Sequence, residues 1–185
     1  MFRHRSSRAG FTLIELIIVM AIMGILIAAS ASTFQTSRIK GKDGKRKSDL
    51  KQVSNALEAY MNDYGVYPLA SSDHKIQACG AGTSTCDWGS AFANNNGTIY
   101  MAQLPSDANN GSQQYQYYVS GDQKMYQLFA ALENTDDSSI LTLDKSCAVS
   151  GASSSESETS TSLNCNYGIS SQNTTPTQFF TSQEQ

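Results

Sequence analysis

Histidine and nucleotide-binding motifs are what this chain most clearly lacks. It has two histidines in 185 residues, and only His74 lies beyond residue 10. No P-loop, dinucleotide-binding glycine run, G-x-S-x-G elbow or H-E-x-x-H pair occurs, and S-x-x-K appears three times without its companion motifs. These absences argue against hydrolases and nucleotide-dependent enzymes, so we expect a protein that is not an enzyme.

Charge is missing from a long segment near the N-terminus. No residue from Leu16 to Ser37 is charged, and residues 16–29 are apolar throughout. Because a helix of about 20 residues crosses the ~30 Å of bilayer hydrocarbon, we expect residues 11–37 to form a transmembrane helix. Glu15 would then lie within the membrane, where an unpaired charge costs about 2.5 to 3.5 kcal/mol. Glu15 is therefore a candidate functional residue that needs a positive partner.

Proteolysis after Gly10 would create that partner, because the new α-amine of Phe11 would lie level with Glu15 of an adjacent copy. The stretch resembles the class III signal of type IV pilins and type II secretion pseudopilins: a basic leader, residues 1–10, followed by Phe-Thr-Leu-Ile-Glu at the start of an apolar helix. The resemblance implies that a prepilin peptidase cleaves after Gly10 and methylates Phe11. It also implies that Glu15 guides subunits into a helical filament.

Other interpretations of the leader do not use Glu15. Ala29-Ser30-Ala31 resembles a signal-peptidase site, which would release a secreted binding protein beginning at Ser32. A membrane-anchored calcium-binding module is a further alternative.

Residues 38–64 contain a basic neck, followed by the amphipathic part of the helix. Residues 1–51 hold ten Lys and Arg against three acids, a net of +7, while residues 52–185 hold three against thirteen, a net of −10. The basic run lacks the interleaved aromatics of nucleic-acid binders, so we expect a solvated neck that faces lipid headgroups. Apolar residues then recur at helical spacing: Leu50, Val53, Leu57, Tyr60, Met61 and Tyr64.

Residues 65–145 are predicted to form a small β head. Gly65 and Pro68 end the helix, and alternating residues on either side of Ser120-Gly121-Asp122 predict a hairpin. We expect a third strand near residues 98–101 or 140–143, and an antiparallel sheet packed on the amphipathic helix. The fold class is α+β. The helix end, Ser48 to Pro68, and the hairpin look like those of G-type major pseudopilins and related pilins.

Four cysteines in an exported head predict two disulfides. Sequence order favours Cys79 with Cys86 and Cys147 with Cys165, although three pairings are possible. The second pair bounds the Ser/Thr-rich C-terminal region, residues 146–185. The cysteine spacings and the single remaining histidine do not fit a zinc site.

A calcium site is a weaker alternative, implied by the G-type pseudopilins, which bind calcium in the head. The sequence offers four carboxylates close together in the chain: Glu133, Asp136, Asp137 and Asp144. Because no calcium-binding loop motif occurs, a solvated acidic loop is the simpler interpretation, and we expect no cofactor.

We interpret the chain as a structural subunit. The precursor would be a single-pass protein of the cytoplasmic membrane. After cleavage it would form a homopolymer on an assembly platform powered by a separate ATPase. We expect the polymer to be an extracellular type IV pilus, with the envelope pseudopilus of type II secretion as the alternative. No specific nucleic-acid partner is expected.

Overall fold

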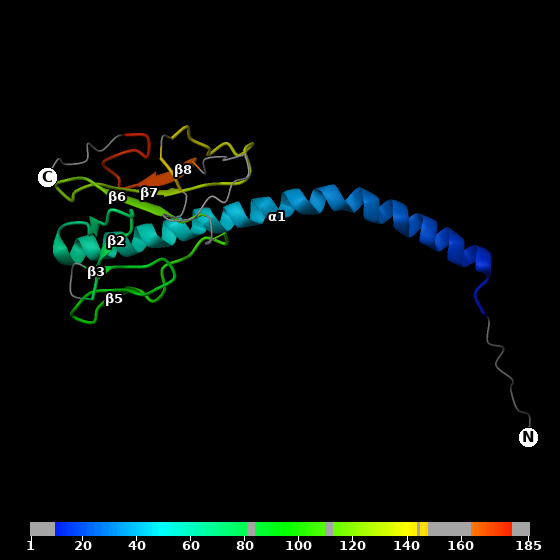
Figure 1. The fold of residues 1–185 in the computed structure, drawn as a ribbon, viewed down its shortest axis with the longest axis horizontal. Coiled ribbons are helices and arrows are strands. Elements are labelled where there is room, and N and C mark those ends of the chain that lie inside the picture. Colours follow the sequence, from blue (N-terminus) through cyan, green and yellow to red (C-terminus); the bar gives the residue numbers. More distant parts are fainter. Residues whose placement is uncertain (1–9, 81–83, 110–112, 144, 148–163, 179–185) are drawn as a thin grey trace, which may run out of the picture. The chain divides into compact units, whose positions relative to one another are not determined.

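The computed structural model describes residues 10–80, 84–109, 113–143, 145–147 and 164–178. The chain divides into two compact units, Met1–Ile39 and Lys40–Gln185. One helix, α1, runs from Leu13 to Tyr64, close to the predicted long helix (Figure 1). With small antiparallel sheets following this helix, the α+β prediction is confirmed.

In the first unit, the α1 residues expose their apolar side chains. Phe11 is 92% exposed, and the large apolar residues between Leu13 and Ile27 are all at least half exposed. No helix within the described residues has a segment that is long and apolar enough to span a membrane.

In the second unit, the predicted amphipathic stripe is largely confirmed. Leu50, Val53 and Leu57 are buried, and Tyr60 and Met61 pack against the same core. Tyr64 is an exception, because it is 44% exposed and stacks on Tyr60 with ring centroids 4.4 Å apart. The stripe therefore ends one turn before the helix does.

The helix ends as the sequence predicts. Gly65 takes a left-handed conformation with φ 70°, and its N–H donates to the carbonyl of Met61 at 2.8 Å. This is the local geometry that favours glycine after a helix. The Lys124 ammonium donates to the Gly65 carbonyl at 2.5 Å, which ties the helix end to the head.

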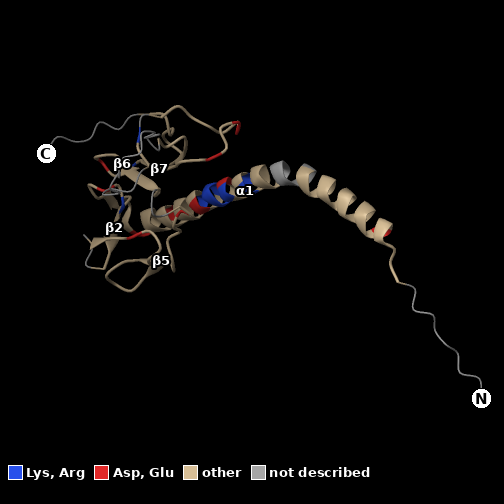
Figure 2. Ribbon diagram, turned by 45° about the vertical axis from the view of Figure 1, so that its right-hand side comes forward, with Lys and Arg blue, Asp and Glu red and all other residues tan. Residues whose placement is uncertain are grey.

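The described strands form three antiparallel sheets. The first contains β1 (Leu69–Ala70), β2 (Ile76–Cys79) and β3 (Ser84–Thr85), and the second contains β4 (Phe92–Ala93) and β5 (Ile99–Met101). The third contains β6 (Gln116–Val119), β7 (Tyr126–Ala130) and β8 (Tyr167–Ser170). The β5 strand lies on the opposite side of α1 from β6 and β7 (Figures 1 and 2).

The predicted hairpin is confirmed, and a strand does form near residues 98–101, but the expectation that it joins the hairpin sheet is wrong. β6 and β7 pair with Tyr117 opposite Leu128. The third strand of this sheet is β8, whereas Ile99–Met101 pairs with β4 and residues 140–143 form no strand. Local alternation could not identify β8, because its pairing with β7 joins segments nearly 40 residues apart.

All five residues of β7 are buried, because both faces of this strand are covered. Tyr126, Leu128 and Ala130 belong to the core formed with α1, and the Tyr126 hydroxyl lies 2.7 Å from that of Ser54. Phe129 belongs to a second, smaller cluster around Cys147 and Cys165.

Candidate assembly site

Glu15 lies at the first turn of α1, in a capping box that our sequence analysis missed. The Thr12 N–H and hydroxyl donate to Oε2 of Glu15 at 2.9 and 2.7 Å, and the Glu15 N–H donates back to the Thr12 hydroxyl at 3.3 Å. Thr12 is the N-cap, and its carbonyl accepts the Leu16 N–H at 3.3 Å. The signal was in the sequence, because Thr-x-x-Glu before an apolar run is typical of a helix start.

Capping leaves half of the Glu15 carboxylate available. Among the described residues, Oε1 has no hydrogen-bond donor, while Oε2 has two. The side chain borders a hollow of about 440 Å³ whose other lining residues are apolar: Phe11, Leu16, Ile18 and Val19. The capping bonds orient the carboxylate, so its second oxygen can accept a cation without the helix start being broken.

The bond between Gly10 and Phe11 lies just outside the helix. Both residues are exposed and belong to no regular element, and a Cβ built on Gly10 meets nothing within 4 Å. The Gly10–Phe11 bond is therefore accessible without any unfolding of α1.

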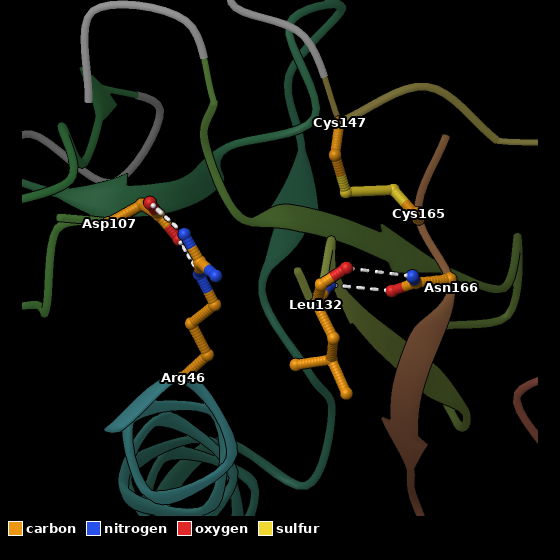
Figure 3. The surroundings of a disulfide bond; sticks show 6 residues. All are labelled: Arg46, Asp107, Leu132, Cys147, Cys165 and Asn166. Carbon is orange, nitrogen blue, oxygen red and sulfur yellow. Dashed lines mark hydrogen bonds and ion pairs between the residues drawn. A yellow bond between two sulfur atoms is a disulfide. The ribbon is translucent and has the colours of Figure 1, made fainter. Parts of the chain in front are cut away.

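A second polar site lies at the neck, where we expected solvated charges. Figure 2 shows that Lys and Arg gather on this part of α1, yet Arg46 is only 1% exposed and Asp43 only 2%. The guanidinium donates twice to Asp107, at 2.7 and 3.1 Å (Figure 3). It also donates to Asp43 at 2.8 Å, Glu133 at 2.8 Å and Gln113 at 3.0 Å. The solvated-neck prediction is therefore wrong for Arg46.

Hydrogen bonds within this Arg46 cage, formed by Arg46, Asp43, Asp107, Gln113 and Glu133, favour the charged forms of Arg46 and Glu133. Burial lowers the pKa of Arg46, but the hydrogen bonds to Asp107 and Glu133 raise the pKa by a larger amount. The pKa of Arg46 therefore lies above its ordinary value. Burial raises the pKa of Glu133, whereas the hydrogen bond to Arg46 lowers it by more, so this pKa lies below its ordinary value. Asp43 also accepts the N–H groups of Glu133 and Asn134 at 3.0 and 2.8 Å, which joins α1 to the segment after β7.

The four candidate calcium ligands differ in their contacts. Glu133 pairs with Arg46 and lies 3.4 Å from the Lys42 ammonium, and Asp137 accepts two bonds from Lys47 at 2.8 Å. Asp136 is exposed, and Asp144 lies outside the described residues. Within the described residues, no group of three His, Cys, Asp or Glu side chains could hold a metal ion. Lysine and arginine side chains of α1 therefore bind Glu133 and Asp137 where a metal ion would have to bind.

The cysteines form the two pairs that sequence order favours, Cys79 with Cys86 and Cys147 with Cys165. Beside the second disulfide, the Asn166 side chain accepts the Leu132 N–H at 2.6 Å and donates to the Leu132 carbonyl at 3.0 Å (Figure 3). This amide continues the β7–β8 ladder beyond Ala130. The disulfide and the amide together place β8 in register.

Comparisons with known proteins match the N-terminal motif and, in longer alignments, most of the chain. Residues 5–31 match the family described as the prokaryotic N-terminal methylation motif. The type II secretion system core protein G of Klebsiella michiganensis is 28% identical over 138 residues, which cover 72% of this chain and 92% of that protein. Its namesake in Pseudomonas aeruginosa is 27% identical over 129 residues, which cover 69% and 84%.

A shorter similarity links the chain to pili. The type IV major pilin protein PilA of Myxococcus xanthus is 35% identical over 65 residues, which cover 35% of this chain and 30% of PilA. No solved structure shows a significant match.

Proposed function

This chain belongs to the family of type IV pilins and type II secretion pseudopilins, and on that premise we propose that it is a prepilin cleaved between Gly10 and Phe11, methylated at Phe11 and polymerised into a filament. The observation that carries this proposal is the N-terminus itself. An exposed Gly10–Phe11 bond lies directly before a capped helix with an exposed apolar surface and a single carboxylate, Glu15.

Before assembly, we propose that residues 11–37 lie in the cytoplasmic membrane with the head outside. Burial of the exposed apolar residues in lipid would stabilise the precursor by about 25 cal/mol for each Å² removed from water. An unpaired Glu15 opposes insertion by about 2.5 to 3.5 kcal/mol. The capping bonds from Thr12 offset part of this cost, because they satisfy one carboxylate oxygen within the same chain.

In the filament, the α-amine of Phe11 in an adjoining subunit would bind the free oxygen of Glu15. This pairing would use the hollow beside Glu15, whose apolar lining would exclude water once neighbouring helices cover it in the filament and would so strengthen the interaction. Partners of the precursor would be a prepilin peptidase and an assembly platform with a separate ATPase. The prediction that the chain is not an enzyme agrees with this structural role.

The lengths of the alignments favour the secretion pseudopilus over the surface pilus. The core protein G of Klebsiella michiganensis aligns over 92% of its own length, whereas PilA aligns over only 30%. A G-type match therefore includes head sequence as well as the N-terminal helix. Labelling with an antibody to the head separates the two forms, since long filaments on intact cells would identify a pilus.

Mass spectrometry of the mature N-terminus tests the proposal, with expected cleavage at Phe11 and one added methyl group. Gly10→Ala should leave the precursor about ten residues longer and unmethylated, because a methyl group at the scissile residue hinders the peptidase. Gly24→Ala is the matched control, since a Cβ there also meets nothing within 4 Å. A mature chain that begins at Ser32, or normal processing of Gly10→Ala, would refute the proposed maturation.

A further inference from the structure

The head contains few cations, and most have partners within the chain. Residues 52–185 hold three Lys or Arg against thirteen Asp or Glu. The Lys75 ammonium lies 2.7 Å from Asp87, and Lys124 donates to the Gly65 carbonyl. Lys145 differs, since among the described residues its ammonium has neither a carboxylate nor a carbonyl as partner. Its ammonium lies instead over aromatic rings, 3.8 Å from the centroid of Tyr118 and 5.2 Å from that of Phe129.

The support under Lys145 is rigid. The Tyr118 ring packs edge-on against Phe129 at 5.6 Å and stacks on His74 at 4.2 Å. The Lys145 carbonyl accepts the Cys165 N–H at 2.7 Å, and Cys165 is bonded to Cys147. Part of the side-chain entropy that an ion pair normally costs is therefore already lost in the free subunit.

The desolvated ammonium favours an anionic partner. Burial lowers the pKa of Lys145 from its ordinary value. The aromatic rings return part of the lost solvation through their quadrupoles, but a carboxylate would return more. The Lys145 ammonium is therefore held in position, while the solvation that it lost on burial is only partly replaced.

We propose that Lys145, held over Tyr118, binds a carboxylate of a second copy of this chain in the assembled filament. Charge complementarity identifies the partner, because residues 65–145 hold three Lys against eight Asp and Glu, so two heads repel except where a cation meets an acid. Asp136 is the carboxylate we assign to the contact. It is exposed and has no ion pair among the described residues, whereas Asp87 and Asp137 pair with lysines and Asp63 and Asp122 accept hydrogen bonds within the chain. Asp73 is also exposed, but it adjoins His74, which stacks on Tyr118 beneath Lys145 of the same chain. The inference rests on the proposed filament.

Charge reversal tests the contact in cells that express the full chain with its assembly machinery. Lys145→Glu should lower the filament yield about tenfold or more, because every repeated contact becomes repulsive. Lys145→Glu with Asp136→Lys should restore most of the yield. Lys51→Glu is the matched control, since it makes the same charge change at an exposed helix lysine and should assemble normally. An equal loss for Lys51→Glu, or no rescue in the double variant, overturns the proposal.

Zero-length carbodiimide crosslinking tests the same contact without mutation. Filaments are assembled from a mixture of ¹⁴N- and ¹⁵N-labelled subunits, and the crosslinked peptides are identified by mass. We expect mixed-isotope peptides that join Lys145 to Asp136, and none from subunits dispersed in detergent. Same-isotope peptides alone, including any to Glu156 or Glu158, would show a partner in the same chain and refute the inference.

The two proposals fail in different ways. If the wild-type chain is neither processed at Phe11 nor assembled, the proposed function is wrong. If wild-type and Lys145→Glu filaments form equally well, only the Lys145 contact is wrong. Loss of heparin binding by otherwise normal Lys145→Glu filaments would instead assign the site to a polyanion and overturn the subunit contact.

Discussion

Replacement of Arg46 by methionine should destabilise the head strongly. The side chain is 1% exposed and donates five hydrogen bonds to four residues: Asp43, Asp107, Gln113 and Glu133. Methionine fills a similar volume but donates none of these bonds. Three carboxylates would then remain close together, with Lys42 at 3.4 Å as the nearest cation.

The expected loss is about 3 to 5 kcal/mol in the free energy of unfolding, the usual cost of removing one partner from a buried ion pair. A single domain is stable by about 5 to 15 kcal/mol, so the variant should fold but lose a large part of its stability. Arg46→Lys should lose less than Arg46→Met. It keeps the charge but has three donors, which cannot satisfy all four acceptor residues.

Urea unfolding of the full chain in detergent measures these losses through the fluorescence of Trp88. This single tryptophan packs edge-on against Tyr115 at 5.5 Å and therefore reports on the head. Lys51→Met is the control, because an exposed lysine should change stability by no more than about 0.5 kcal/mol. If Arg46→Met unfolds within about 1 kcal/mol of the wild type with an unchanged m value, the cage does not stabilise the head.

Three other variants test separate parts of the structure. Glu15→Gln keeps a capping side chain but removes the charge, so it should be processed normally yet assemble poorly; wild-type filament yield would show that Glu15 only caps the helix. Gly168→Ala should cost about 1 to 3 kcal/mol in urea unfolding, because the new Cβ would lie 2.7 Å from the Phe129 ring, whereas Gly41→Ala should cost nothing. His74 has its pKa lowered by burial and then by Lys145, so the folded head favours neutral imidazole and should lose stability as pH falls below about 6.5. His74→Asn should flatten the unfolding free energy between pH 7.5 and 5.5, and an unchanged slope would show that another group titrates.

Local sequence patterns predicted the elements that depend on neighbouring residues. The helix stripe at Leu50, Val53 and Leu57 follows from a 3.6-residue period, and Gly65 marks the end of the helix by its backbone freedom. The β6–β7 hairpin follows from alternation around a short turn. Each of these signals lies within a few residues, so no distant contact was needed to interpret it.

The neck shows why composition alone was insufficient. Its lysines and arginines have the same charge in the sequence, but among those that the structure describes only Arg46 is fully buried, where it meets Asp107, 61 residues away. Lys45 pairs with Asp49 one turn along the helix and stays 55% exposed. Which of these like-charged residues is buried depends on which loops cover its face of the helix.

The sequence by itself determined the family, the basic leader, the position of Glu15 and the long helix, because these reside in contiguous residues and in the 3.6-residue period. Only the tertiary structure decided that Arg46 is buried in a carboxylate cage, that β8 completes the sheet and that Lys145 lies over Tyr118. Each of these contacts joins segments separated by 27 residues or more. Their free energy arises only when the folded backbone brings charges and ring faces within a few ångströms of one another.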